Sequence, residues 1–175
     1  MSATTRTTYH KADSATKAYH DKTATRAMNV IGLFEHCGLL PNGPSAWGET
    51  IPCELAGVYT VTVNPDPAWN AGLQAPSELS PELRVRWLPG QPILYIGKAG
   101  GLGLKSTLRK RIGQFYRHRY GDRSPHRGGQ DLKLLLPLPL WLFWAPRQDP
   151  LAVEHMMLAA FRLDAGHRPF AIRQG

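Results

Sequence analysis

The stretch that decides the fold is "PILYIGKAGGLGLKSTLRKRIGQFYRHRYG", residues 92–121. It starts with the apolar run 92–97, which predicts a buried strand. The glycines that follow predict a tight turn, because glycine adopts backbone conformations that other residues avoid. Residues 106–120 then predict a basic helix, with Ser106 in position to cap its first turn. Its apolar stripe consists of Leu108, Ile112 and Phe115.

The rest of the chain predicts a small α/β domain around this unit. We expect further strands at 55–64, where β-branched residues alternate, and at 139–146. Helices are expected at 25–37, with Gly38 as a stop, at about 81–87, and from the cap Asp149–Pro150 to about Asp164. Residues 39–52, punctuated by proline and glycine, are expected to form a loop. The predicted fold class is α/β (α+β), with a three-stranded mixed sheet flanked by helices.

The chain divides into three parts on composition. Residues 1–24 hold few large apolar groups and are expected to form a flexible basic arm. Residues 25–54 would add an N-terminal helix and loop to the main domain, 55–175. Within that domain the proline-rich segment at about 65–91 is predicted to be an insertion.

The formal net charge is +8, and the positive charge is concentrated. Residues 98–127 hold nine Lys or Arg against one acidic residue, Asp122. Such a cluster can bind a polyanion by releasing its counterions. Charge alone leaves ribosomal, membrane-surface and nucleic-acid-enzyme interpretations open.

Other sequence features narrow the class and the compartment. Cys37 and Cys53 are the only cysteines and are expected to be reduced thiols, not a disulfide or a zinc site. No apolar leader follows the first residues. The richest apolar run, 134–144, is too short to cross a bilayer and contains two prolines. We therefore expect an intracellular, cytoplasmic protein without a membrane partner.

The glycine-rich turn does not fit a nucleotide-binding loop. The Walker pattern requires glycine immediately before its Lys-Ser pair and again five residues earlier. Aligned on Lys105 and Ser106, these positions hold Leu104 and Ala99. In addition, no alignment places glycine at the three positions that the dinucleotide-binding fingerprint requires. An ATPase or GTPase is accordingly the weakest of the interpretations.

Four elements together suggest another interpretation. They are "GVY" (57–59), "YIG" (95–97), "LRKRIGQFY" (108–116) and the later helical Glu154. In this order, and on these kinds of predicted element, they resemble the GIY-YIG nuclease family, over about residues 56–161. The resemblance implies a GIY-YIG-like fold and a metal-dependent endonuclease that hydrolyses phosphodiester bonds in DNA, with RNA not excluded. It also implies Mg²⁺, or Mn²⁺, as cofactor.

The resemblance assigns roles to matching residues. Tyr59 would activate or position the attacking water, and Tyr95 would contact that water or the phosphate. Arg111 would bind the scissile phosphate, and Glu154 would hold the metal ion. Lys98 would lie near the phosphate. Further candidates for contact with the nucleic acid, on the basic helix and the loop after it, are Lys105, Arg109, Lys110, His118, Arg119 and His126.

The chemistry of phosphodiester hydrolysis explains why these residue types would be needed. Phosphodiester hydrolysis needs an oriented water, a proton acceptor and cations that neutralise the transition state. A tyrosine titrates near pH 10, so Tyr59 needs neighbouring cations to act as a base. The planar fork of Arg111 suits a phosphate, and Mg²⁺ often takes only one or two protein carboxylates.

Glu154 is unusual independently of any family. In "PLAVEHMMLAAF" (150–161) only it and His155 are polar, so its carboxylate is desolvated, ion-paired or metal-bound. The competing interpretation is a structural glutamate that pairs with a core arginine. For Tyr59 and Tyr95 the competing interpretation is packing within the sheet. For the basic run it is a helix face exposed to solvent.

Two positions depart from the family pattern. Phe115 stands where many members have His or Tyr one turn after the arginine, and Ala171 stands where an Asn often follows the last helix. These departures support a second hypothesis, a nucleic-acid-binding protein of the same fold that does not cut. The target sequence, the number of strands cut and the oligomeric state stay open.

Overall fold

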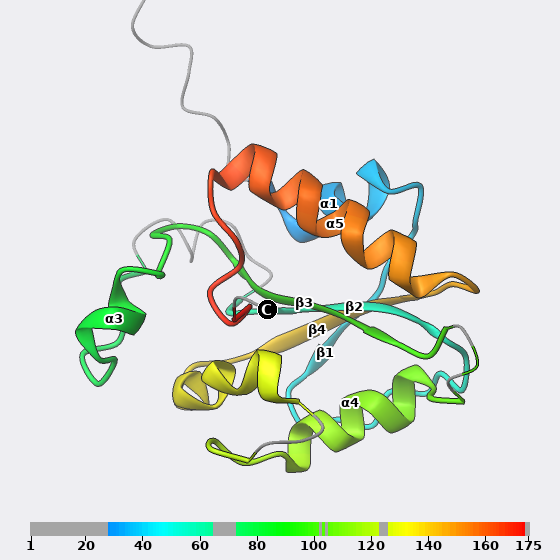
Figure 1. The fold of residues 1–175 in the computed structure, drawn as a ribbon, viewed down its shortest axis with the longest axis horizontal. Coiled ribbons are helices and arrows are strands. Elements are labelled where there is room, and N and C mark those ends of the chain that lie inside the picture. Colours follow the sequence, from blue (N-terminus) through cyan, green and yellow to red (C-terminus); the bar gives the residue numbers. More distant parts are fainter. Residues whose placement is uncertain (1–27, 65–72, 102, 104, 123–125, 174–175) are drawn as a thin grey trace, which may run out of the picture.

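The computed structural model describes residues 28–64, 73–101, 103, 105–122 and 126–173. At its centre is a four-stranded antiparallel sheet with the order β1-β4-β2-β3 (Figure 1). The strands are β1 (Asn42–Ala46), β2 (Gly57–Thr62), β3 (Ile93–Ala99) and β4 (Trp141–Pro146). The three strands expected from the sequence are present, and β2 lies between β4 and β3.

The predictions of three strands and of a mixed sheet were wrong. The fourth strand, β1, occupies part of the segment that we expected to be a loop. Its sequence "NGPSA" has no apolar alternation, because β1 is an edge strand that pairs only with β4. The register shifts between Asn42 and Ser45, around a Gly-Pro pair. An edge position tolerates proline because one side of the strand has no ladder to complete.

Helices cover both faces of the sheet (Figure 1). On one face lie α1 (Val30–His36) and α5 (Pro150–Ala165), and on the other lie α4 (Leu108–Arg117) and the 3-10 helix η1 (Arg127–Leu135). The short helix α3 (Pro81–Arg84) stands apart from these layers at one end of the sheet. The helix η1 was not predicted from the sequence.

Strand β2 separates the two apolar layers. It is buried along its whole length. Val58 packs in the layer that contains α1 and α5, whereas Tyr59 and Val61 pack in the layer of α4 and η1. This is the two-residue alternation of a strand, and it directs the tyrosine of "GVY" toward α4.

Helix ends agree with the sequence in part. Asp149 caps α5, where its side chain accepts a hydrogen bond from the Ala152 amide at 3.3 Å. Gly38 follows α1 with a positive φ of 68°. The cap of α4 is Thr107, which accepts from the Lys110 amide at 3.2 Å, so the prediction of Ser106 was wrong by one residue.

Parts of the predictions lie outside the described residues. These are the arm 1–24, the start of the helix expected at 25–37, and positions 65–72 of the expected insertion. Among the helices that the structure describes, none is long and apolar enough to cross a membrane.

Candidate functional site

A pocket of about 450 Å³ opens where β3, the glycine-rich turn, α4 and α5 meet. Its lining contains four cationic side chains and one carboxylate. The lining residues are Tyr95, Lys98, Gly100, Lys105, Ser106, Lys110, Arg111, Gln114 and Glu154. Six of the residues predicted from the sequence therefore meet at one place. Such a pocket can hold an anion and, at its carboxylate, a cation.

The two tyrosines lie side by side but differ in access to the pocket. Their ring centroids are 5.8 Å apart. Tyr95 lines the pocket, whereas Tyr59 is fully buried and does not. Within the described part of the chain the Tyr59 hydroxyl makes no well-formed hydrogen bond. Tyr95 can touch a ligand directly, and Tyr59 supports it from behind.

Burial determines the protonation of both phenols. Burial is the largest of the effects that bring the pKa of Tyr95 to about 12; the charge of Glu154 adds to it and that of Arg111 opposes it. Burial also raises the pKa of Tyr59 well above its usual value, and the neighbouring Tyr95 adds to this effect. Both groups are thus protonated at neutral pH. A cation bound beside them would lower both pKa values.

The glycine of "GVY" lets α4 approach the sheet. A Cβ atom at Gly57 would lie 2.2 Å from the Ala145 carbonyl oxygen and 2.8 Å from Cδ1 of Leu108. The first turn of α4 is also tied to the segment before β2, since the Leu108 amide donates to the Leu55 carbonyl at 2.8 Å. This close packing fixes the helix that carries Arg111.

Glu154 stands on α5 with its side chain half-buried. No hydrogen bond or salt bridge joins its carboxylate to another described residue. Burial raises the pKa of Glu154, while the charges of Lys98, His155 and Arg111 lower it, in that order. The pairing with a core arginine that we considered as an alternative is absent from the described residues.

Arg111 is held by its backbone and leaves its guanidinium for the pocket. Its amide donates to the Thr107 carbonyl at 2.8 Å, and its carbonyl is 3.1 Å from Nε2 of His126. Its side chain has no hydrogen bond or salt bridge to a described residue. The guanidinium can therefore bind an anion without first breaking an ion pair.

Four predicted contact residues lie elsewhere. Arg109 forms an exposed ion pair with Glu54 at 3.0 Å, outside the pocket. Arg119 is exposed beyond the end of α4. His118 and His126 are buried, with ring centroids 5.9 Å apart. None of the four lines the pocket.

His126 has a structural environment. Its ring stacks on Phe115, with centroids 4.6 Å apart and an interplanar angle of 15°. Burial, together with the charges of Arg111 and His118, lowers the pKa of His126 to about 3. A neutral, buried imidazole of this kind is a poor candidate for a proton donor at neutral pH.

The sequence analysis missed Gln114 and Ser106 as lining residues. The helical spacing of Gln114, three residues after Arg111, contained the signal. Ala171, at the position where the family often has Asn, is buried, and its amide donates to the Leu94 carbonyl at 2.9 Å. It anchors the C-terminal segment to β3 and brings no polar side chain.

The donor set for a metal ion is small. Among the described residues, no group of three or more His, Cys, Asp or Glu side chains forms a metal site. Glu154 is the pocket's one carboxylate, which fits a hard cation that keeps most of its waters. Compared with known proteins, the chain matches no family model, no curated protein and no solved structure.

Proposed function

We propose that the protein is a metal-dependent endonuclease of the GIY-YIG type that hydrolyses phosphodiester bonds in DNA. The observation that carries this proposal is the meeting of Lys98, Arg111 and Glu154 in one pocket beside Tyr95. Cationic groups alone would suit any anion. A half-buried carboxylate among them, without a partner in the described part of the chain, suits a cation that accompanies the anion.

The pocket residues divide the work of phosphodiester hydrolysis. Arg111 and Lys98 neutralise the phosphate, and the charge that develops on its oxygens in the transition state. The Tyr95 hydroxyl orients the attacking water, because it is the phenol that lines the pocket. Tyr59 positions Tyr95 and acts through it.

Glu154 would hold Mg²⁺ or Mn²⁺. When bound, the ion supplies Lewis-acid polarisation of the phosphate and lowers the pKa of its water ligands. The residues around Glu154 fit this use, because burial without a protein partner makes its ionised form costly until a cation arrives.

Nucleic acid is the polyanion that suits the surroundings of the pocket. Lys105 and Lys110 extend its positive lining beyond the phosphate position, from the turn onto α4. The same region of the sequence holds the excess of Lys and Arg. Phosphate neutralisation of this kind gives sequence-independent affinity that falls with salt.

A plasmid-nicking assay in Mg²⁺, with and without EDTA, tests the proposal. We expect the wild-type protein to nick only without EDTA. The variant Glu154→Gln should retain DNA binding and lose cleavage by at least about 10²-fold. The control is Glu35→Gln, which neutralises an exposed glutamate on α1 and should cut at the wild-type rate.

The same assay distinguishes the endonuclease from the second hypothesis, a nucleic-acid-binding protein of the same fold that does not cut. A wild-type protein that binds DNA tightly and leaves the plasmid intact at every Mg²⁺ and Mn²⁺ concentration would be a binding protein of this fold. Cleavage by Glu154→Gln at the wild-type rate would contradict the assignment of the metal ligand.

A further inference from the structure

A second pocket, of about 540 Å³, lies at the C-terminal end of α5, where this helix, the C-terminal segment, η1 and the end of α3 meet. Its polar lining is almost entirely cationic. The charged and titratable members are Arg86, Asp131, Arg162, His167, Arg168 and Arg173. We call this site the arginine pocket.

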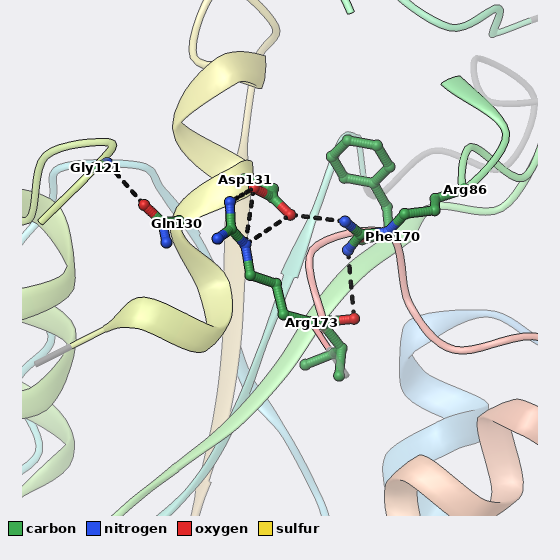
Figure 2. Close-up of polar contacts among 7 residues, drawn as sticks. Arg86, Gly121, Gln130, Asp131, Phe170 and Arg173 are labelled. Atoms are coloured by element: carbon green, nitrogen blue, oxygen red, sulfur yellow. Dashed lines mark hydrogen bonds and ion pairs between the residues drawn. The ribbon is translucent and has the colours of Figure 1, made fainter. Parts of the chain in front are cut away.

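The floor of the arginine pocket is a fixed arrangement of charges (Figure 2). Asp131 is completely buried, and it lies between Arg86 and Arg173. Nη1 of Arg86 donates to it at 2.7 Å, and Arg173 donates through Nε at 3.1 Å and through Nη2. Arg86 also donates to the carbonyls of Phe170 and Ile172. One carboxylate thus holds two guanidiniums in place.

The rim of the pocket carries two arginines without such partners. Arg162 and Arg168 are exposed, and their side chains make no hydrogen bond or salt bridge to a described residue. Four arginines face one aspartate in this lining. The C-terminal end of α5 offsets only about half a charge. A net positive potential remains, and it suits an anion.

A groove adjoins the arginine pocket along α5. The groove, about 370 Å³, is lined by His155, Leu158, Ala159, Arg162, Arg168 and Ile172. Arg162, Arg168 and Ile172 line the arginine pocket too. His155 adjoins Glu154 in the sequence and acts on its pKa. The groove therefore extends the arginine pocket along α5 toward the turn that carries Glu154.

The spacing along α5 between one residue of each pocket fits a polymer. Glu154 and Arg162 are eight residues apart on α5, which corresponds to about 12 Å at 1.5 Å per residue. A small anion occupies one of the pockets at a time. A chain of phosphates reaches both.

We infer that the arginine pocket binds a backbone phosphate of the nucleic-acid strand whose scissile phosphate lies at Arg111 and Glu154. This inference rests on the proposed function for its ligand. Arg162 and Arg168 supply the contacts, because their guanidiniums have no partner among the described residues and can bind phosphate through two parallel hydrogen bonds. Arg86 and Arg173, ordered by Asp131, form the cationic floor.

Fluorescence anisotropy of a labelled 20-base-pair duplex across a salt series tests the inference, with every protein carrying Glu154→Gln. We expect Arg162→Ala/Arg168→Ala to weaken binding at least 10-fold at low salt. The slope of log affinity against log salt should fall by about 1.8, since each lost phosphate contact in duplex DNA removes about 0.9. Arg147→Ala is the control. It removes an exposed arginine that lines neither pocket nor the groove along α5.

Two outcomes decide the inference. A salt slope and affinity for the double variant equal to those of Arg147→Ala, with an unchanged circular dichroism spectrum, would overturn it. If the double variant shows a reduced salt slope but an unfolded spectrum, Arg168→Lys replaces it in the measurement. If the planar fork of the arginine binds phosphate, this variant should keep most of the salt slope and lose part of the affinity.

The inference can be separated from the proposed function. Bis(p-nitrophenyl) phosphate carries one phosphate and cannot occupy the candidate functional site and the arginine pocket at once. With Glu154 intact, the double variant should hydrolyse it at the wild-type rate in Mg²⁺ and cut the duplex more slowly. Absence of plasmid nicking by the wild type would contradict the endonuclease, whereas the anisotropy result would still decide whether the arginine pocket binds nucleic acid.

Discussion

Tyr59 and Gly97 are direct partners across β2 and β3, and the Tyr59 ring occupies the space that a side chain at position 97 would fill. A Cβ atom at Gly97 would lie 2.9 Å from Cζ of Tyr59 and 2.6 Å from Cε1 of Tyr95. The glycine of "YIG" is therefore what allows the two phenols to lie together. Each glycine of the two motifs has a steric reason of its own.

Replacing Gly97 by Ala should destabilise the protein, because both rings must move to admit a methyl group. We expect the free energy of unfolding to fall by about 1–3 kcal/mol in urea denaturation. The matched control is Gly113→Ala in α4, where the nearest atom to the new Cβ is the end of the Arg117 side chain at 3.6 Å. That variant should gain about 0.5–1 kcal/mol, since alanine is the better helix former. Equal effects at the two sites would contradict the steric explanation.

The two tyrosines should respond differently to loss of the hydroxyl. Tyr59→Phe removes a buried hydroxyl that makes no well-formed hydrogen bond, so we expect the unfolding free energy to stay the same or rise by about 1 kcal/mol. Tyr95→Phe should lower kcat for cleavage about 10²-fold, because this phenol lines the pocket. A larger loss of kcat in Tyr59→Phe than in Tyr95→Phe would place the water at Tyr59 instead.

The pH profile of cleavage should depend on Lys98. Glu154 must be ionised to hold a cation, burial raises its pKa, and Lys98 is the neighbour that lowers it most. Lys98→Met should therefore move the acid limb of kcat/KM to higher pH, whatever it does to the maximum rate. Lys110→Met is the control, since Lys110 lines the pocket but is not among the groups that act on the pKa of Glu154. The same displacement in both variants would contradict this electrostatic link.

His126 should make the protein acid-sensitive. Its pKa is lowered from 6.5 to about 3 in the folded state. Below pH 6.5, His126 is therefore protonated in the unfolded chain while it stays neutral in the folded chain. The contribution of neutral His126 to the free energy of unfolding is complete above pH 6.5. It falls by about 1.4 kcal/mol per pH unit between pH 6 and pH 4. His126→Gln, which can still donate to the Arg111 carbonyl, should lose this slope in urea titrations. An unchanged slope would show that His126 is protonated when folded.

Asp131 should contribute far more to stability than an exposed acid. Asp131→Asn leaves Arg86 and Arg173 without their shared charge, and we expect a loss of about 2–4 kcal/mol at pH 7. Glu54→Gln breaks the exposed pair with Arg109 and should cost at most about 1 kcal/mol. Burial acts to raise the pKa of Asp131, but the hydrogen bonds from Arg173 and Arg86 lower it overall. Its contribution is accordingly present above about pH 3.9 and is lost as the pH falls below that value.

Local chemistry made much of the fold predictable. The β-branched alternation around Val58, the apolar stripe on α4 and the Asp149 cap each depend on residues near in sequence, and each was confirmed. The strand β1 could not be found in this way, because its place comes from pairing with β4. The helix η1 was missed for a similar reason, since the partners of Asp131 lie 45 and 42 residues away.

The parts of the candidate site that depend on local motifs and periodicity could be predicted from the sequence. The motif "LRKRIGQFY" assigned the phosphate to Arg111, which lines the pocket, whereas Arg109 pairs with Glu54 outside it. Periodicity could not show that Tyr59 is sealed behind Tyr95, because that depends on the register between β2 and β3. Nor could it show that His118 and His126 face the core, which depends on how the segment after α4 returns to Phe115.

The pairing of β1 with β4 also bears on the order of folding. The Asn42 side chain donates to the Trp144 carbonyl across a sequence separation of 102 residues. Closing so long a loop costs chain entropy before any contact repays it, so such pairings form late and slow the overall rate. We expect β2, β3 and α4 to associate first and β4 to arrive afterwards, between β2 and β1. The carboxylate of Glu154, carried by the helix that follows β4, then joins cationic side chains that are already assembled.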